Sequence, residues 1–324
     1  MSHTSIVMLN WNGASDTIEC LESVLRLRRA EFRVIVCDNG SSDSSLERIS
    51  AWARVAGIPF QQVRAGQQII PPLAKLVLID NGANLGFAAG NNTGIELALA
   101  LLETTHVWLL NNDTIIEPNA LEEMLRRMAQ DQTLGACGSL IKFYDDRSII
   151  QAVGGCSFNF NTGIASQTLG RYLPDTTVID VSEYEAKMDY ISGASMLLSR
   201  GYLETIGLME ESYFLYYEEI DWAVRAKGQF RLGIAVNSVV YHKEGSGTGS
   251  ASFKSAASPV SEFYMIRSKL RFMRKHLRHH LPTVYLTTFA QALNRFRRGE
   301  WQAGSAILTA LSSRNFVHAK SVVA

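Results

Sequence analysis

The sequence of 324 residues is poor in cysteine and has no long apolar run. Its four cysteines are Cys20, Cys37, Cys137 and Cys156. None forms the close pairs of zinc or thioredoxin-like redox sites. No apolar run reaches the ~18 residues that a membrane-spanning helix needs, and the N-terminus lacks the basic start and apolar core of a secretory signal. We therefore expect reduced thiols in a cytoplasmic protein, or in one held peripherally on the inner face of the cell membrane.

Acidic residues are absent from one long stretch. Between Phe263 and Arg298 there are nine Lys/Arg residues and no Asp or Glu, which leaves 22 basic against 31 acidic residues elsewhere. Apolar residues recur there at helical spacing: Phe263, Ile266, Leu270, Met273, Leu277 and Leu281. The pattern predicts a basic amphipathic helix that Pro282 interrupts, with further helical segments around Phe289 and Trp301. Region 263–298 either packs on the rest of the protein or contacts lipid headgroups; no nucleic-acid-reading module accompanies it.

A Gly-x-Gly-x-x-Gly fingerprint is also missing after the first strand-like run, where "NWNGASD" stands instead. This absence argues against a Rossmann dinucleotide oxidoreductase. The first third nevertheless alternates short β-branched runs with helix-period segments. The alternation predicts βαβ units, and hence an α/β fold with a mostly parallel central sheet and helices on both faces.

Each expected strand of the first third ends in polar or glycine-rich residues. These exits are "NWNG" at 10–13, "DNGSSD" at 38–43, "NGANLG" at 81–86 and "NND" at 111–113. Any one of them could be a helix cap, but carboxyl ends of parallel strands share one rim, where open α/β sheets bind ligands. At that rim Asp113, flanked by amides, offers hard oxygen donors for Mg²⁺ or Mn²⁺.

The second half is less regular. Residues 151–187 predict a long loop or hairpin excursion, followed by a strand in "MDYISGASMLLS", a short helix in "RGYLETIG", a helix in "EEIDWAVRAKG" and a strand pair in "FRLGIAVNSVVYH". His242 ends the last run and precedes a Gly/Ser segment, 245–250. That position is typical of a ligand at the base of a closing loop.

Three carboxylates crowd together in "YYEEIDW": Glu218, Glu219 and Asp221. Mutual repulsion raises the pKa of at least one of them and leaves a group able to act as a general base near neutral pH. The alternative is an acidic first helical turn that complements the helix dipole. Neighbouring aromatic residues, including Trp222, favour a sugar-binding surface.

Together these motifs resemble family 2 glycosyltransferases with the GT-A fold, within the branch that includes bacterial rhamnosyltransferases. The resemblance runs from Ser5 to about Ser250, with the motifs in the expected order. It implies a GT-A domain over 1–260, with a Rossmann-like nucleotide-sugar-binding half (1–113) and an acceptor and catalytic half (114–260). Residues 261–324 would form a C-terminal basic amphipathic helical region.

The resemblance also implies roles for individual residues. Donor contacts fall on Asn10, Asn12, Asp38, Asn84, Gly86, Asn91, Asn112 and Asp113. Acceptor contacts fall on Gly193, Ala194, Ser195 and Trp222. Asp38 is similar to the carboxylate that hydrogen-bonds a pyrimidine, and Asp113 is the one carboxylate retained from the family's Asp-x-Asp motif. Asp113 and His242 would hold the divalent cation. Glu219 takes the place of the base, usually Asp, so Glu218 and Asp221 stay open as alternatives.

The implied activity is an inverting transfer of a sugar, L-rhamnose from dTDP-L-rhamnose, to a saccharide or lipid-linked oligosaccharide in cell-surface polysaccharide or O-antigen synthesis. It would use Mg²⁺ or Mn²⁺. Two alternatives remain: a transferase with another donor such as a UDP-sugar, and a nucleotide-sugar-binding protein without catalysis, which the single carboxylate of "NND" keeps open. We expect no nucleic-acid partner, and the sequence leaves a homo-oligomer open.

Overall fold

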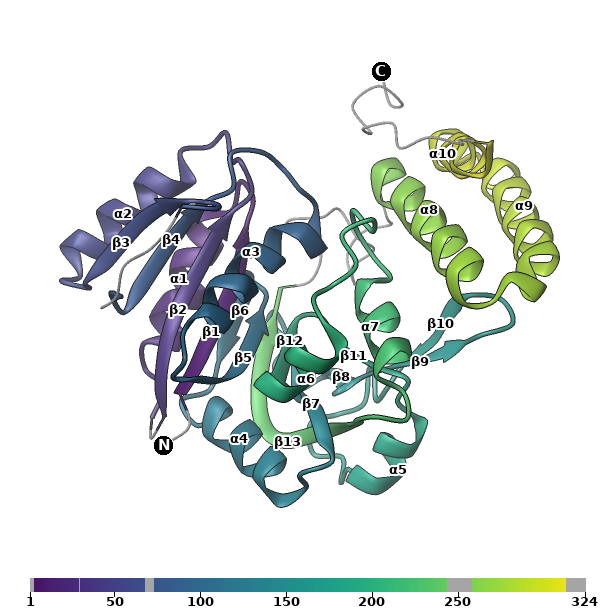
Figure 1. Cartoon of the computed structure of the whole chain (residues 1–324). Helices are drawn as coiled ribbons and strands as arrows, with labels where there is room; N and C mark the ends of the chain where they lie inside the picture. The colour runs from purple at the N-terminus through teal and green to yellow at the C-terminus, as the bar shows by residue number, and fades with distance from the viewer. Residues whose placement is uncertain (1–2, 29, 68–72, 244–257, 313–324) are drawn as a thin grey trace.

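The computed structural model describes residues 3–28, 30–67, 73–243 and 258–312. Within these residues, most strands join one ten-stranded sheet, ordered β3-β4-β2-β1-β5-β12-β7-β13-β6 with β8 beside β7 (Figure 1). Its first six strands in the chain are β1 His3–Asn10, β2 Glu31–Asp38, β3 Phe60–Arg64, β4 Leu76–Asp80, β5 Thr104–Leu110 and β6 Thr114–Ile116. The other four are β7 Leu134–Phe143, β8 Ile150–Val153, β12 Ser195–Ser199 and β13 Arg231–His242.

The sheet is mostly parallel. Strands β3, β4, β2, β1 and β5 run in one direction, and β12 runs antiparallel between β5 and β7. The register places Asn10 beside Asp38, and Asp38 beside Asp80. The polar ends of three strands therefore lie side by side at one rim, as the βαβ pattern predicts.

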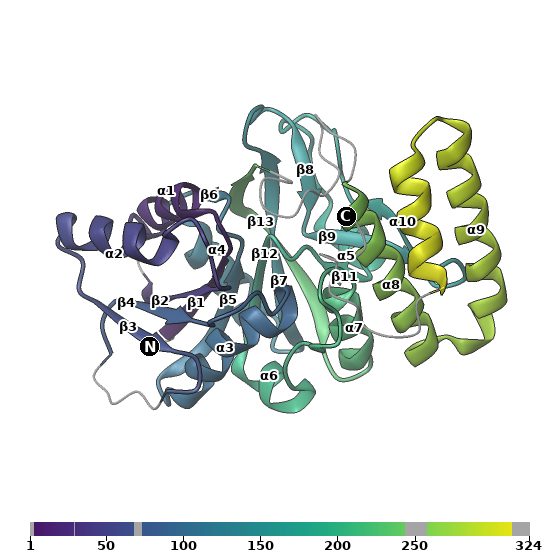
Figure 2. The ribbon, with the colours of Figure 1, turned by 90° about the horizontal axis from the view of Figure 1, so that it is seen from above.

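Helices cover both faces of the sheet (Figure 2). On one face lie α1 Ala14–Val24, α2 Ser45–Val55 and α4 Ala120–Gln130. On the other lie α3 Phe87–Ala100, α6 Arg200–Ile206 and α7 Glu218–Ala226. In β1, Ile6 and Met8 pack into the first layer and Val7 into the second, because alternate strand residues point to opposite faces.

The irregular region contains a small second sheet, ordered β10-β9-β11. Its strands are β9 Gly155–Asn159, β10 Ile164–Thr168 and β11 Tyr190–Ile191, and α5 Val181–Lys187 precedes β11. Two expectations need correction. The strand expected in 188–199 is broken between β11 and β12. In place of the expected strand pair in 230–242, the chain forms the single strand β13. Its register with β7 shifts between Ala235 and Val239, and a β-bulge makes such a shift possible without a turn.

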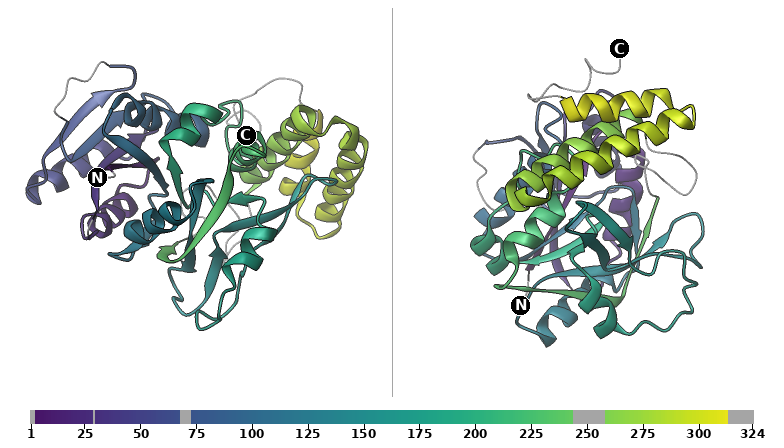
Figure 3. Two further views of the ribbon diagram at one scale, coloured as in Figure 1. Left: turned by 60° about the horizontal axis from the view of Figure 1, so that its bottom comes forward. Right: turned by 90° about the vertical axis from the view of Figure 1, so that its right-hand side faces the viewer.

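The C-terminal region folds into α8 Pro259–His276, a 3₁₀ turn Arg278–His280, α9 Leu281–Arg297 and α10 Trp301–Ser312. They pack on one another beyond β9 and β10 (Figure 3). The first helix ends earlier than its apolar spacing predicted, at His276. Pro282 lies in the first turn of α9 rather than breaking a helix, because a residue there needs no backbone N–H partner.

Two further expectations concern cysteines and membrane spans. All four cysteines are free and buried, and burial raises the pKa of each thiol, to about 12 for Cys20, Cys37 and Cys137. Over the described residues, no helix combines the length and the apolar character needed to cross a bilayer.

Candidate active site

The first part of the rim is built around Asp38, which is 2% exposed. Its Oδ1 accepts hydrogen bonds from Asn10 Nδ2 and Ser41 Oγ, both at 2.6 Å, and its Oδ2 accepts from Ser41 N at 2.9 Å. A carboxylate has about four acceptor positions, so one remains on Oδ2. Asp38 borders a cavity of about 300 Å³ that Ser41 and Asp80 also line. Asn10 is fully buried and orients Asp38.

Other expected donor residues shape the loops of this rim. Asn12 adopts a left-handed φ of 53° and accepts from Ser42 N at 2.7 Å. Asn84 Oδ1 accepts from Gly86 N at 3.0 Å. Gly86, with φ of 85°, passes so close to Phe214 that a Cβ would overlap the Phe214 carbonyl. The side chains of Asn12 and Asn84 therefore hold the backbone turns of this rim.

Asn91 and Asn112 are also tied to the protein. Asn91 is 2% exposed, and its Nδ2 donates to Phe87 O one helical turn earlier, at 3.0 Å. Asn112 Nδ2 donates to Thr17 Oγ1 at 3.0 Å. Both amides therefore stabilise the rim from within.

Asp113 and His242 meet where β5 and β6 join the end of β13. His242 Nε2 lies 3.3 Å from Asp113 Oδ1, and the register pairs His242 with Thr114. On its other side, His242 Nδ1 is 2.8 Å from Oε1 of Gln151. Since an amide oxygen only accepts, Nδ1 carries a proton and donates to it. Nε2, turned toward Asp113, is then the ring nitrogen available to a proton or a cation.

This pair fits a divalent cation in part. One carboxylate oxygen and one imidazole nitrogen are ligands that Mn²⁺ accepts, and a hydrogen bond from the outer ring nitrogen to a fixed acceptor is the usual support of a metal-bound histidine. Among the residues described, no group of three or more His, Cys, Asp or Glu side chains could hold a metal. A cation held by Asp113 and His242 would therefore take its remaining ligands from a bound diphosphate and from water. The Gly/Ser segment 245–250 lies outside the described residues.

The second part of the site is a cavity of about 220 Å³ that contains the Glu219 carboxylate. Glu219 lies in the first turn of α7. Aromatic side chains form much of the wall: Phe158 of β9, Tyr190 of β11, and Tyr216 and Tyr217 of the turn before α7. Met265 of α8 also lines the cavity. A carboxylate among aromatic walls can hold a sugar and accept a proton from it.

Glu219 has a raised pKa. Burial raises the pKa of its carboxyl to about 6, although hydrogen bonds from the backbone of Glu219 and Gly193 act in the opposite direction. The neighbouring Glu218 is 2% exposed, and its Oε2 has no hydrogen-bond partner within the described structure. Burial, followed by the charge of Glu219, raises the pKa of Glu218 well above its usual range. The stronger rise therefore falls on Glu218, while Glu219, with its pKa of about 6, is largely ionised at neutral pH.

The turn that presents Glu219 is strained. Tyr216 and Tyr217 have φ of 68° and 75°, a left-handed conformation that costs about 1–3 kcal/mol per residue. The Tyr216 hydroxyl hydrogen-bonds Ser261 Oγ of α8 at 2.6 Å, and the Tyr217 hydroxyl donates to Gly163 O. Contacts from α8 and from the β9–β10 turn thus hold the strained turn in place.

Asp221 has different surroundings. It is fully buried outside this cavity, within hydrogen-bond distance of Arg225 at 2.8 Å, Lys275 at 2.9 Å and His276 at 2.6 Å. Burial opposes its ionisation, but hydrogen bonds from His276, Lys275 and Arg225, together with the charge of Lys275, outweigh burial and lower the pKa of Asp221 to about 2. Such a weakly basic carboxylate links α7 to α8 and is a poor proton acceptor.

The four residues expected to contact the acceptor lie in different surroundings. Gly193 lines the Glu219 cavity, and a Cβ on Gly193 would overlap the Glu219 carboxylate. Ala194 is 4% exposed, and its carbonyl accepts from Asn111 N at 3.1 Å. This bond connects the cavity to the rim that carries Asp113. A side chain at position 193 would therefore displace the Glu219 carboxylate.

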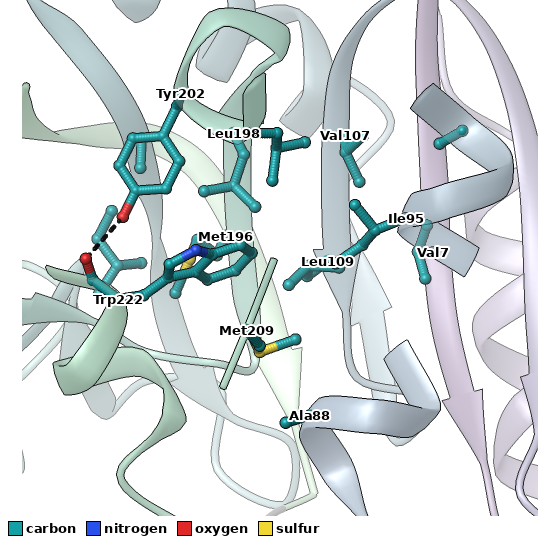
Figure 4. Close-up of a cluster of buried hydrophobic side chains, with 14 of the residues drawn as sticks. Val7, Ala88, Ile95, Val107, Leu109, Met196, Leu198, Tyr202, Met209 and Trp222 are labelled. Atoms are coloured by element: carbon teal, nitrogen blue, oxygen red, sulfur yellow. Dashed lines mark hydrogen bonds between the residues drawn. The ribbon is translucent and has the colours of Figure 1, made fainter. Parts of the chain in front are cut away.

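Two of those residues belong to the core. Ser195 is fully buried and accepts from Trp108 Nε1 at 2.9 Å. Trp222 is 1% exposed, and its Nε1 donates to Gly207 O at 2.8 Å. Figure 4 shows Trp222 among Met196, Met209 and Tyr202. Trp222 follows Asp221 on the short helix α7 and points inward. It therefore packs in the core instead of contacting a sugar.

Several residues of the site were not singled out from the sequence. Tyr190 and Met265 line the cavity, Gln151 orients His242, and Ser261 holds Tyr216. Each lies far along the chain from the residue that it contacts. Periodicity gave no signal for them, although Tyr190 precedes the expected "SGAS" segment by two residues.

Comparison with known proteins adds two kinds of similarity. The sequence pattern of glycosyl transferase family 2 matches residues 5–206. Over 224 residues, the chain is 30% identical to the low-salt glycan biosynthesis hexosyltransferase Agl10 of Haloferax volcanii (strain ATCC 29605). That match covers 69% of this chain and 61% of the relative, so the chain aligns with about three fifths of the relative's length.

Solved structures with similar folds include the following three. The mannosyltransferase PcManGT from Pyrobaculum calidifontis, in complex with GDP-Man and Mn²⁺, has a TM-score of 0.54 at 15% identity, covering 99% of this chain and 78% of that chain. GalNAc-T7 with UDP, GalNAc and Mn²⁺ has a TM-score of 0.57 at 14% identity, with coverages of 83% and 47%. S. aureus TarS 1-349 has a TM-score of 0.51 at 15% identity, with coverages of 96% and 81%. At these identities the similarity concerns the fold.

Proposed function

Since the chain belongs to glycosyl transferase family 2, we propose that it transfers a hexosyl group from a nucleotide-sugar donor to a saccharide acceptor, with Glu219 as the general base. The GT-A fold expected from the sequence is confirmed by the mostly parallel sheet and by the structural neighbours. Similarity to the hexosyltransferase Agl10 supports glycan synthesis as the setting.

The observation that carries this proposal is the Glu219 carboxylate in an aromatic cavity, with its pKa raised to about 6. An acceptor hydroxyl in that cavity would give its proton to Glu219 while its oxygen bonds to the anomeric carbon of the donor. The bond from that carbon to the diphosphate breaks, and the nucleoside diphosphate leaves with the electron pair. Direct displacement of this kind inverts the anomeric configuration. The aromatic walls keep water away from the reacting carbon.

The donor would lie along the rim. In this arrangement Asp38 uses its remaining acceptor position for an N–H of the nucleobase, and the loops held by Asn12 and Asn84 border the ribose and phosphates. Asp113 and His242 would hold Mg²⁺ or Mn²⁺. When bound, such an ion neutralises the charge that develops on the leaving diphosphate. Neighbours that contain Mn²⁺ with GDP-Man or UDP support this choice of cofactor.

For the donor itself we propose dTDP-L-rhamnose, on the strength of the order and identity of the sequence motifs. For the product we propose a cell-surface polysaccharide or O-antigen. A UDP-sugar is the alternative donor.

Replacement of Glu219 by Gln tests the base. We expect Glu219→Gln to reduce turnover by at least about a hundredfold, because general-base catalysis contributes about 10²–10⁴-fold, and to leave nucleotide binding nearly unchanged. Product release by chromatography would measure the first and calorimetric titration of nucleoside diphosphate the second. Glu204→Gln is a matched control, since Glu204 is an exposed partner of Arg200.

Glu218→Gln completes the set. Because Glu218 does not line the cavity and burial raises its pKa well above its usual range, the neutral amide should retain most of the activity. Full turnover by Glu219→Gln would contradict the assignment of the base. Absence of any transfer by the unchanged protein, with intact nucleotide binding, would instead favour a nucleotide-sugar-binding protein.

A further inference from the structure

The outward side of α9 carries a row of apolar side chains. The side that packs on the rest of the protein has three buried residues: Val284, Thr288 and Ala292. Since each helical residue advances by about 100°, Leu286 and Leu293 point away from this side, and Phe289 lies between them and the buried side. Leu286, Phe289 and Leu293 are 71%, 49% and 48% exposed. A helix that is apolar on both sides needs a second apolar partner.

The row continues onto α10. Trp301 is 68% exposed, and its ring lies 5.4 Å, centre to centre, from the ring of Phe296 at the end of α9. We define Leu286, Phe289, Leu293 and Trp301 as the α9 face. In Figure 1, α9 lies at the edge of the molecule farthest from β3 and α2, so a flat partner can approach it.

Positive charge frames the α9 face. Arg278 lies just before α9, and Arg297 and Arg298 lie at its end; all three are exposed. The three α9 residues of this face lie within the stretch 263–298, which has no acidic residue. The nearest acidic residue beyond it, Glu300, is paired with Arg295. An apolar centre between basic ends is the pattern of surfaces that bind anionic bilayers.

A second copy of the chain fits this face poorly. Four side chains of this size expose on the order of 400 Å² of apolar surface, about half of the ~800 Å² that each partner buries in a stable complex. Pairing two α9 faces would also bring the arginines of both copies together without an acidic residue between them, and like charges at an interface are strongly unfavourable.

We propose that the α9 face docks on an anionic lipid bilayer, with its apolar row at the boundary between headgroups and acyl chains and its arginines on headgroup phosphates. The same C-terminal region reaches the catalytic cavity, because α8 contributes Met265 to its wall and Ser261 to the support of Tyr216. Resting on the proposed function, we infer further that the acceptor is a saccharide on a lipid carrier. A protein docked through α9 would meet such an acceptor beside the cavity wall.

Vesicle sedimentation with the full chain tests the docking. The protein should sediment with vesicles of phosphatidylcholine and phosphatidylglycerol, and much less with phosphatidylcholine alone. Phe289→Ser/Leu293→Ser should lower the partition coefficient by about tenfold or more. Leu102→Ser/Val178→Ser is the matched control, because both residues are more than 90% exposed elsewhere on the surface, and it should bind like the unchanged protein.

A second variant, Arg297→Glu/Arg298→Glu, tests the charge without touching the apolar row, and it should remove the preference for phosphatidylglycerol. Thermal unfolding of each variant checks that it remains folded. Equal binding by the folded serine variant and the unchanged protein would overturn the docking proposal. So would light scattering that shows a dimer in the unchanged protein and a monomer in the serine variant. Vesicle binding needs no donor, so these results do not depend on the proposed transfer reaction.

Discussion

At the scale of single residues, the two neighbouring glutamates of α7 differ in their surroundings. Glu218 is buried, and its Oε2 has no hydrogen-bond partner within the described residues, whereas Glu219 lines the cavity. Adjacent positions on a helix point about 100° apart. Two identical neighbouring residues are therefore placed in different environments, one enclosed by the protein and one at the wall of the cavity.

The pKa of Glu219, at about 6, sets the expected pH dependence of transfer. Only the ionised carboxylate accepts a proton, so kcat/KM should be low below pH 6, rise as the pH passes through about 6, and level off above it. Initial rates between pH 5 and 8 would measure this profile. A flat profile over that range would be inconsistent with Glu219 as the base.

Gln151 is expected to position His242. Gln151→Leu removes the oxygen that accepts from His242 Nδ1, and Gln151→Glu keeps an oxygen there. Loss of such a supporting contact typically weakens metal binding by 10–100-fold. We therefore expect Mn²⁺ affinity, measured by electron paramagnetic resonance with nucleoside diphosphate present, to fall about tenfold in the Leu variant and less in the Glu variant. Equal affinities for all three proteins would contradict the role.

At the scale of elements, α8 is joined to α7 through charge. Asp221 of α7 meets Lys275 and His276 of α8. This contact attaches the C-terminal helices to the helix that carries the base. Part of the basic stretch 263–298 therefore packs on the rest of the protein, which was one of the two predictions for it. The end of the stretch in α9 stays exposed.

Asp221→Asn should destabilise the protein by about 2 kcal/mol, allowing for partial exposure of its partners. The pKa of Asp221 falls from 3.8 to about 2 on folding. The contribution of ionised Asp221 to the free energy of unfolding is therefore complete above about pH 4 and is lost as the pH falls toward 2. Urea unfolding at pH 7 and pH 3 would measure it: the two proteins should differ more at pH 7. A constant difference would show that the charge is not responsible.

At the scale of the whole molecule, the rim and the cavity meet through the bond between Asn111 and Ala194. A donor that spans them should stabilise the folded chain as a unit. Ligand at a hundred times its dissociation constant adds about 2.7 kcal/mol, so Tm should rise by several degrees.

A thermal-shift panel of dTDP-rhamnose, UDP-sugars and GDP-mannose, each with Mg²⁺ or Mn²⁺, would identify the donor. We expect the largest rise with dTDP-rhamnose and a smaller one without metal. A larger rise with a UDP-sugar would favour the alternative donor. Asp113→Asn serves as the control for metal-dependent stabilisation.

The sequence by itself determined the α/β class, the places of β1, β2, β4 and β5 along the chain, and the polar residues at the ends of these strands. Alternating apolar residues set which faces of β1 are buried, and turn residues such as Gly86 mark where the chain leaves the sheet. Local spacing suffices for such features because each depends on neighbours within a few residues.

Only the tertiary structure decided which polar residues reach the site. It separated Glu219 from Glu218 and Asp221, placed Trp222 and Ser195 in the core, and brought Tyr190, Gln151 and Met265 to the site from distant segments. Burial, pKa and contact depend on which segments pack together across the sheet and on α8. Those contacts join residues far apart in the chain, where no local pattern records them.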